Sequence, residues 1–334
     1  MKTNDTILDL ICKNASVNEI CKVTGLSHKQ LFYRINMLKI KGYDFKKKYF
    51  YSGDIVYSLI KEFNKEENGQ TIYTSSKDTE FKALLISDLH LGSIDERPEL
   101  LFEVYNYAIK DGINIIINAG DLIDGTFGQK EHKITDINKQ IEHLLKSYPF
   151  DKNILNFICL GNHDFSCLEK VGLDISKILD NKRHDLVSLG YGEGYINVKN
   201  DIITVRHPKT KMKEEKRVID RGLILSGHRH SSKFVSNGHI VNLHLPSLSN
   251  MNTSIPYPSI VKMTTDFNNG IFNLGIFEHL IFIKSKLYKV SESQYQLHEG
   301  KDTSNSSINN EELLKSIKYN VKSEDKEPES NQKN

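Results

Sequence analysis

The sequence predicts an α/β protein with two packed β-sheets and a small helical module before them. Two observations predict this fold class. Between residues 80 and 186, apolar runs of strand length alternate with amphipathic helical segments, which is typical of layered α/β folds. From Val187 onward short strand-like runs dominate, which indicates a second sheet packed on the first. The 334 residues suffice for two domains, or for one large domain with attachments.

The composition is that of a protein with a substantial apolar core. Hydrophobic residues make up 38% and charged residues 26%, and a net charge of +2 indicates no particular partner. The first residues lack the apolar stretch of a secretory signal, and no run approaches the ~20 apolar residues of a membrane helix. The four cysteines show no C-x-x-C spacing, so we expect free thiols in a reducing compartment. We therefore expect a cytoplasmic protein without membrane association.

Residues 1–60 are predicted to form a small helical module. Two pairs of residues have the spacing of a capping box, which marks the start of a helix, and Gly25 ends the first helix of the two. The pairs are Ser16 with Glu19 and Ser27 with Gln30. Two short capped helices around a glycine turn resemble a helix-turn-helix. Two strand-like runs around Gly53 follow, as in a wing hairpin, so the module resembles a winged-helix domain.

The module carries an excess of positive charge. Residues 1–50 hold ten Lys or Arg and four Asp or Glu. This excess is equally consistent with a polyanionic partner such as DNA and with a basic surface that is simply solvated. An apolar stripe on the second capped helix leaves the opposite face for bases or phosphates. The residues predicted on this face are Lys29, Gln30, Tyr33 and Arg34. The hairpin lysines 46–48 could add phosphate contacts.

The rest of the chain divides by composition. Residues 61–79 are polar and are expected to be a linker with a short strand near Ile72. Residues 80–300 are expected to form the main domain. Residues 301–334 are expected to be a disordered tail. In the main domain, helices are predicted at 97–112 and 134–148. Strands are predicted at 81–87, 113–118, 154–160, 194–198, 202–207, 223–228, 239–245, 259–265 and 270–277.

Potential metal ligands follow the apolar runs of the main domain. They are Asp88 with His90, Asp121, Asn162 with His163, His207, and His228 with His230. Ligands gather beyond the carboxyl ends of strands in α/β sheets, so we expect these side chains to meet. Residues i and i+2 of an extended chain face the same way, so each spaced pair is expected to face one site. The glycines at 120, 161 and 227 are expected to let the chain turn sharply.

These residues form an ordered set of motifs: D-x-H, G-D, G-N-H-D, a lone H and G-H-x-H. The set comprises Asp88–His90, Gly120–Asp121, Gly161–Asp164, His207 and Gly227–His230. It resembles the signature of the calcineurin-like metallophosphoesterases, and the resemblance covers roughly residues 80–265. It implies a two-sheet αββα sandwich with outer helices that binds two divalent metal ions and hydrolyses a phosphate ester.

The resemblance also implies a role for each residue. Asp121 would be shared by both ions. The first ion would be completed by Asp88, His90 and His230, and the second by Asn162, His207 and His228. His163 would protonate the leaving oxygen or stabilise its charge, and Asp164 would orient His163. Mixed nitrogen and oxygen ligands suit Mn, Fe, Zn or Ni equally, and a pair of such ions supports attack of water on phosphorus.

A phosphodiesterase or nuclease that acts on nucleic acid or nucleotides is the expected function. The family also contains phosphomonoesterases, and the motifs do not separate these activities. One alternative is a DNA-binding regulator whose phosphoesterase domain acts on a small nucleotide. Another is a phosphomonoesterase whose N-terminal module docks protein.

Other polar residues near the motifs have ordinary interpretations. Arg206 and Arg229 alternate away from the ligands, which predicts a structural or outer role. Asp124 is expected to be a turn residue, with support of a ligand as the alternative. The histidines outside the motifs are expected at the surface. They are His28, His132, His143, His184, His239, His244, His279 and His298.

Overall fold

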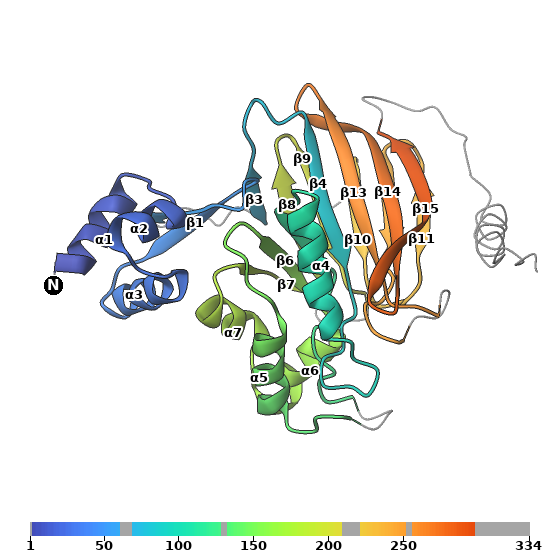
Figure 1. The fold of residues 1–334 in the computed structure, drawn as a ribbon, viewed down its shortest axis with the longest axis horizontal. Helices are drawn as coiled ribbons and strands as arrows, with labels where there is room; N and C mark the ends of the chain where they lie inside the picture. The colour runs from blue at the N-terminus through green and yellow to red at the C-terminus, as the bar shows by residue number, and fades with distance from the viewer. Residues whose placement is uncertain (1, 61–68, 128–131, 209–220, 252–255, 298–334) are drawn as a thin grey trace, which may run out of the picture.

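Two β-sheets pack face to face in the computed structural model (Figure 1), which describes residues 2–60, 69–127, 132–208, 221–251 and 256–297. One sheet has eight strands in the order β11-β12-β10-β9-β8-β3-β1-β2, and the other has seven in the order β15-β14-β13-β4-β5-β6-β7. Apolar side chains from both sheets form a continuous core between them. The mixed α/β fold with two sheets is therefore confirmed.

The seven-stranded sheet combines a parallel and an antiparallel part. Its parallel strands are β4 (Glu80–Ile86), β5 (Ile115–Asn118), β6 (Leu155–Leu160) and β7 (Leu186–Tyr191). Its antiparallel strands are β13 (Ser259–Asn268), β14 (Ile271–Ile283) and β15 (Lys286–Gln296). β5 and β6 are buried along their whole length, which explains their uninterrupted apolar sequences.

Helices cover the outer face of this sheet (Figure 1). They are α4 (Glu99–Lys110), α5 (Ile137–Ser147), α6 (Asn162–Val171) and α7 (Ile175–Lys182). The sequence did not predict α6 and α7, because both are short and α6 begins two residues after β6 ends. It also did not predict β7, the four-residue β11 (Lys233–Ser236), or β15, whose sequence is largely polar.

The eight-stranded sheet joins the N-terminal hairpin to strands from the second half of the chain. The hairpin consists of β1 (Phe45–Phe50) and β2 (Ile55–Leu59). The other strands, besides β11, are β3 (Gln70–Tyr73), β8 (Glu193–Val198), β9 (Asp201–Arg206), β10 (Gly222–Ser226) and β12 (Ile240–His244). β9, β10 and β12 run parallel to one another, so their carboxyl ends lie at one edge of the sheet.

Three helices precede the hairpin: α1 (Lys2–Cys12), α2 (Val17–Thr24) and α3 (His28–Ile40). Both predicted capping boxes form, at the starts of α2 and α3, and Gly25 ends α2 in the left-handed conformation with φ of 70°. The capping prediction is therefore confirmed. No helix among the described residues is long and apolar enough to cross a membrane.

The hairpin is continuous with the main domain. β1 pairs in parallel with β3, and β3 pairs in parallel with β8, so the segment expected as a linker contains a strand of the large sheet. At the hairpin tip, a Cβ on Gly53 would lie 1.8 Å from the carbonyl oxygen of Asn153, just before β6. Residues 61–68 of the expected linker and the expected disordered tail, 301–334, lie outside the described residues.

Helix α3 also packs against the main domain, next to α7. Phe32 of α3 is buried with its ring 5.1 Å from the ring of His184, and His28 Nδ1 lies 3.4 Å from His184 Nε2. Lys47 of β1 forms an ion pair of 2.5 Å with Asp180 of α7. The prediction that Lys47 contacts phosphate is therefore wrong for this structure, since its ammonium group already has a carboxylate partner.

The prediction that every histidine outside the motifs lies at the surface is also wrong. His184 and His279 are buried, the first beneath the N-terminal module and the second against Ser232, whose Oγ is 2.9 Å from its Nδ1. His132 and His143 are half-buried beside the carboxylates of Asp124 and Glu96. Each has a polar or aromatic partner distant in sequence, which no local pattern reveals. His298 lies outside the described residues.

Mild acid should destabilise the folded chain through His184. Burial lowers the pKa of His184 from 6.5 to about 4. Between these values the unfolded chain binds a proton that the folded chain excludes, so this contribution to stability is complete above pH 6.5 and is lost as the pH falls towards 4. The loss is about 1.4 kcal/mol per pH unit in that window.

Urea unfolding at pH 7.5 and pH 5.0 measures this effect. The difference in unfolding free energy between the two pH values should be smaller for His184→Phe than for the natural chain, because the phenyl ring keeps the packing and cannot be protonated. The same difference in both proteins would show that His184 is not responsible.

Candidate metal centre

The predicted ligands converge at one edge of the sandwich, where strands of both sheets end. Asp88, Asp121 and Asn162 follow β4, β5 and β6 of the seven-stranded sheet, and His207 and His228 follow β9 and β10 of the eight-stranded sheet. Three groups of side chains have potential ligand atoms within 4.8 Å of one another. They are Asp88, His90 and His230; His90, Asp121 and His163; and Asp121, His207 and His228.

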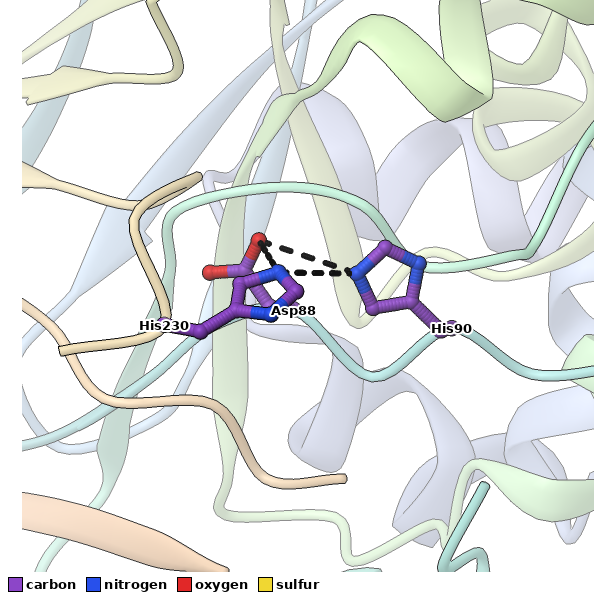
Figure 2. A group of neighbouring side chains, drawn as sticks. All are labelled: Asp88, His90 and His230. Atoms are coloured by element: carbon purple, nitrogen blue, oxygen red, sulfur yellow. Dashed lines mark hydrogen bonds and ion pairs between the residues drawn. The ribbon is translucent and has the colours of Figure 1, made fainter. Parts of the chain in front are cut away.

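Asp88, His90 and His230 form the first group (Figure 2). The Nε2 atoms of His90 and His230 lie 3.1 Å apart, and His230 Nε2 lies 3.2 Å from Asp88 Oδ1. Asp88 is fully buried and accepts hydrogen bonds from Ser87 Oγ at 2.6 Å and from the His228 N–H at 3.0 Å. Its carboxylate is thus held in place from the side opposite the imidazoles.

Asp121, His207 and His228 form a second group that shares a border with the first. Asp121 Oδ2 lies 3.0 Å from His207 Nε2 and 3.9 Å from His90 Nε2, so this carboxylate stands between the two groups. The other ring nitrogen of His207, Nδ1, lies 2.6 Å from the carbonyl oxygen of Ala119. That carbonyl accepts a hydrogen bond from Nδ1 and so fixes the ring with Nε2 towards the Asp121 carboxylate.

A buried polar atom without a hydrogen-bond partner marks this place as one that fits metal ions. Asn162 Oδ1 is buried and has no hydrogen-bond partner in the structure, and the buried His207 Nε2 lies 3.0 Å from the carboxylate of Asp121. An unpartnered buried polar atom costs about 1–3 kcal/mol, so Asn162 Oδ1 calls for an explanation. An amide oxygen, imidazole nitrogens and carboxylates together are a suitable donor set for a divalent transition metal.

The backbone at the cluster is strained. Ten non-glycine residues with positive φ occur among those described, and five of them belong to the cluster. They are Asp88, His90, Asp121, His228 and His230, with φ between 45° and 78°. Strain of this kind concentrates at functional sites. The prediction that each i, i+2 pair faces one site holds for Asp88 with His90, which lie in one group, whereas His228 and His230 lie in different groups. The predicted reason is wrong for both pairs, because β4 and β10 end before these residues and the chain is not extended there.

Two glycines of the motifs are required for close approach. A Cβ on Gly161 would lie 2.2 Å from Asp121 Oδ1, and a Cβ on Gly227 would lie 2.3 Å from Ser87 Oγ and 2.4 Å from the carbonyl oxygen of Ala119. Neither glycine has a positive φ, so the expected sharp turn is not the reason for them. Of the three motif glycines, Gly120 alone combines positive φ (103°) with a close neighbour, His207 Nδ1.

The charges of the cluster are strongly coupled. Burial would raise the pKa of Asp121, but His207, His163 and His90 outweigh it and hold this pKa well below the usual value. Burial likewise would lower the pKa of His207, yet Asp121 raises it to about 10. The pKa of His90 falls to about 3, chiefly through burial. The Asp121 carboxylate is therefore anionic at neutral pH, as a metal ligand must be.

His163 lies beside the ligands and is partly exposed. Its Nδ1 is 2.7 Å from the carbonyl oxygen of Asp124 and 3.8 Å from the Asp124 carboxylate, and its ring centroid is 4.6 Å from that of His90. The carbonyl fixes a proton on Nδ1 and so sets the orientation of the ring. Asp124, which was expected to be a turn residue, is thus the group that orients His163, and His132 in turn contacts its carboxylate.

The prediction that Asp164 orients His163 is wrong, because the Asp164 carboxylate contacts backbone N–H groups instead. Its buried carboxylate accepts hydrogen bonds from the N–H groups of Leu122 at 3.0 Å, Ile123 at 3.2 Å and Gly161 at 2.9 Å. Burial, reinforced by Asp121, raises the pKa of Asp164 to about 7. Asp164 therefore ties the start of α6 to the loop after β5, which fixes the distance between Asn162 and Asp121.

The two arginines lie outside the ligand cluster, as predicted. Arg206 forms an ion pair with Glu193, and Arg229 is exposed.

The two-sheet sandwich and its ligand cluster define a metallophosphoesterase fold. A family model described as calcineurin-like phosphoesterase matches residues 81–268, more than half of the chain, and the chain therefore belongs to this family. The resemblance inferred from the sequence motifs is confirmed. The matched region ends at the last residue of β13, so β14 and β15 extend the sheet beyond it.

Several solved structures are similar to this chain at low sequence identity. The phosphoesterase Yfce from E. coli is 13% identical, with 65% of this chain and 100% of that chain covered and a TM-score of 0.41. Vacuolar protein sorting 29 from Cryptosporidium parvum is 14% identical, with 66% and 100% covered and a TM-score of 0.40. The nuclease MPE from Pseudomonas putida is 14% identical, with 62% and 86% covered and a TM-score of 0.33. At these TM-scores none of them bears on activity. A search of curated proteins found no match.

Replacing Gly161 with alanine should disrupt the candidate metal centre. The new methyl group would overlap the Asp121 carboxylate, so affinity for Mn²⁺ or Zn²⁺ should fall at least about tenfold. Isothermal titration with each ion measures the affinity. Gly112→Ala is the matched control, because its Cβ would meet open space and its φ of 66° affects only local stability. Equal metal affinity in both variants would contradict the assignment.

Proposed function

We propose that this protein is a metal-dependent hydrolase of phosphodiesters in nucleotides or nucleic acid. The observation that carries the proposal is the ligand cluster, with its buried anionic carboxylates and its unpartnered Asn162 side-chain oxygen. Family membership supports the reaction class, because the family is one of phosphoesterases.

The residues have separate tasks in the proposed reaction. One metal ion would be held by Asp88, His90 and His230, a second by Asn162, His207 and His228, and Asp121 would serve both. Two divalent ions, when bound, neutralise phosphate oxygens and make water a better nucleophile.

His163 would act on the leaving oxygen. Its Nε2 is presented because Nδ1 is engaged with Asp124, and the Asp124 carboxylate is close enough to stabilise a positive charge on the ring. A proton passed from Nε2 to the departing oxygen completes cleavage of the phosphorus–oxygen bond.

Hydrolysis of bis(p-nitrophenyl) phosphate tests the proposal. Protein treated with a chelator and dialysed should be inactive, and added Mn²⁺, Zn²⁺, Ni²⁺ or Fe²⁺ should restore turnover. Undiminished hydrolysis by the fully demetallated protein would overturn the proposal.

The variant His163→Ala separates the chemistry from metal binding. It should keep the metal content of the natural chain, measured by elemental analysis, and lose roughly 10²–10⁴ in rate on a diester with an alkoxide leaving group. Loss of the metal together with the activity would assign His163 to the ligand set instead.

We further propose that the N-terminal module is a winged-helix-like element that binds nucleic acid. Lys29, Gln30, Tyr33 and Arg34, the residues predicted for this contact, are all exposed on α3, and the apolar stripe opposite them is buried. The module contacts the main domain near Asn153 and His184, at the beginnings of β6 and β7. The metal centre lies beyond the end of β6, ~20 Å away for six residues of strand. The module would therefore hold nucleic acid at a distance from the reaction.

Replacing Arg34 with alanine should weaken binding to duplex DNA and make it less dependent on salt. Each lost phosphate contact lowers the slope of log affinity against log salt by about one. Fluorescence anisotropy over a range of salt concentrations measures this slope. Lys182→Ala, which removes a lysine of α7 in the main domain, is the control and should change neither quantity. Equal slopes for Arg34→Ala and the natural chain would contradict the proposal that the module binds nucleic acid.

A further inference from the structure

An exposed aromatic ring stands next to His163. Phe127 lies in the loop after β5, with its ring centroid 4.8 Å from that of His163 and its side chain 38% exposed. Within the part of the chain that the structure describes, the ring belongs to neither hydrophobic core. An exposed phenylalanine beside the proposed proton donor is available to a bound molecule.

The two residues before Phe127 are firmly held. The Gly125 N–H donates to Gln140 Oε1 at 2.9 Å, and the Thr126 N–H donates to Ser166 Oγ at 3.0 Å. A Cβ on Gly125 would lie 2.3 Å from the carbonyl oxygen of His163, so the loop is pressed against α6. Phe127 is thereby placed before any ligand arrives, which reduces the entropy lost on binding.

A positive charge lies near the same ring. Lys170 Nζ of α6 is 5.0 Å from the Phe127 centroid and donates to the carbonyl oxygen of Thr126 at 3.3 Å. His163 and Lys170 therefore both lie beside Phe127. A proton donor, an aromatic ring and a cation that lie close together match the leaving oxygen, the base and the next phosphate of a nucleotide chain.

We propose that Phe127 and Lys170 form a subsite for a nucleoside leaving group. This inference rests on the proposed phosphodiesterase function and specifies its substrate class. The phosphorus–oxygen bond to the nucleoside breaks as the oxygen of water bonds to phosphorus, and the departing oxygen takes the proton from His163. The attacking water releases a proton to the solvent, and His163 takes up a proton from the solvent before the next turnover. Phe127 stacks on the base of the departing nucleoside, and Lys170 attracts the phosphate that follows it in a longer strand.

A pair of dinucleotides isolates the contribution of the base. One is thymidylyl-thymidine, and the other has the same sugar-phosphate chain but no base on the leaving nucleoside. Both have the same leaving alkoxide, so the ratio of their kcat/KM values reports recognition of the base alone. The natural protein with Mn²⁺ should prefer the substrate with the base by roughly 5–150-fold, the range for stacking of one base on an aromatic side chain.

Substitutions assign this preference to Phe127. Phe127→Leu should bring the ratio close to one, chiefly through KM, and Phe127→Tyr should preserve it. Phe102→Leu, which changes an exposed phenylalanine on α4, is the matched control and should also preserve it. A ratio that persists in Phe127→Leu while both rates fall equally would show that Phe127 only supports His163, and this outcome would overturn the subsite.

Two further outcomes separate the inference from the function on which it rests. If the natural protein cleaves both dinucleotides equally well, the phosphodiesterase function stands and the base subsite is overturned. If it cleaves neither dinucleotide and no other diester, the proposed function itself fails and the subsite falls with it.

The length of the substrate tests Lys170. Lys170→Gln should lower kcat/KM for a trinucleotide, which has a phosphate beyond the leaving nucleoside, more than for the dinucleotide. This result would favour nucleic acid strands over dinucleotides as the source of the leaving nucleoside. Equal effects on both lengths would overturn the role of Lys170.

Discussion

The arrangement of the site depends on one buried carboxylate, that of Asp121. An isolated buried charge is costly, so its surroundings must stabilise it. Imidazoles that follow strands of both sheets do so: the Nε2 atoms of His207 and His90 lie 3.0 Å and 3.9 Å from Asp121 Oδ2. The backbone N–H of His163 donates a hydrogen bond of 2.9 Å to Asp121 Oδ1. Because these groups come from strands far apart in sequence, the carboxylate holds the two sheets in register at this edge. The absence of a side chain at Gly161 leaves the space that Asp121 fills.

The same constraint explains why the site is strained and yet well ordered. Five residues of the cluster adopt positive φ, a conformation that costs about 1 kcal/mol or more per residue. The surrounding structure compensates through fixed hydrogen bonds, such as those of Ser87 and the His228 N–H with Asp88 and those of Asp164 with the loop after β5. Side chains oriented in advance are what metal binding and catalysis require. The apolar cores on the two faces of the seven-stranded sheet thus offset the conformational strain at the strand ends.

Much of this site could be predicted from the sequence, but not the reasons for its geometry. The ligands could be named because each follows an apolar run, and parallel strands end at one edge. The pairing of His228 with Asp121 and of His230 with Asp88 could not be derived by strand alternation, since left-handed residues break the alternation. Asp124 was missed as the partner of His163 because the contact uses its backbone carbonyl, which any residue could supply. Asp164 was misassigned because adjacency in sequence does not place two side chains together at the start of a helix.

For the N-terminal module, local sequence signals were enough to predict the helices but not their contacts with the rest of the chain. Capping boxes are local, so α2 and α3 could be located closely. The pairing of β1 with β3 and the burial of Phe32 and His184 depend on contacts between distant segments. These contacts make the module part of the eight-stranded sheet, and its apolar residues join the core between the sheets. The module therefore contacts the main domain at the beginnings of β6 and β7, whereas the metal centre lies beyond the opposite end of β6.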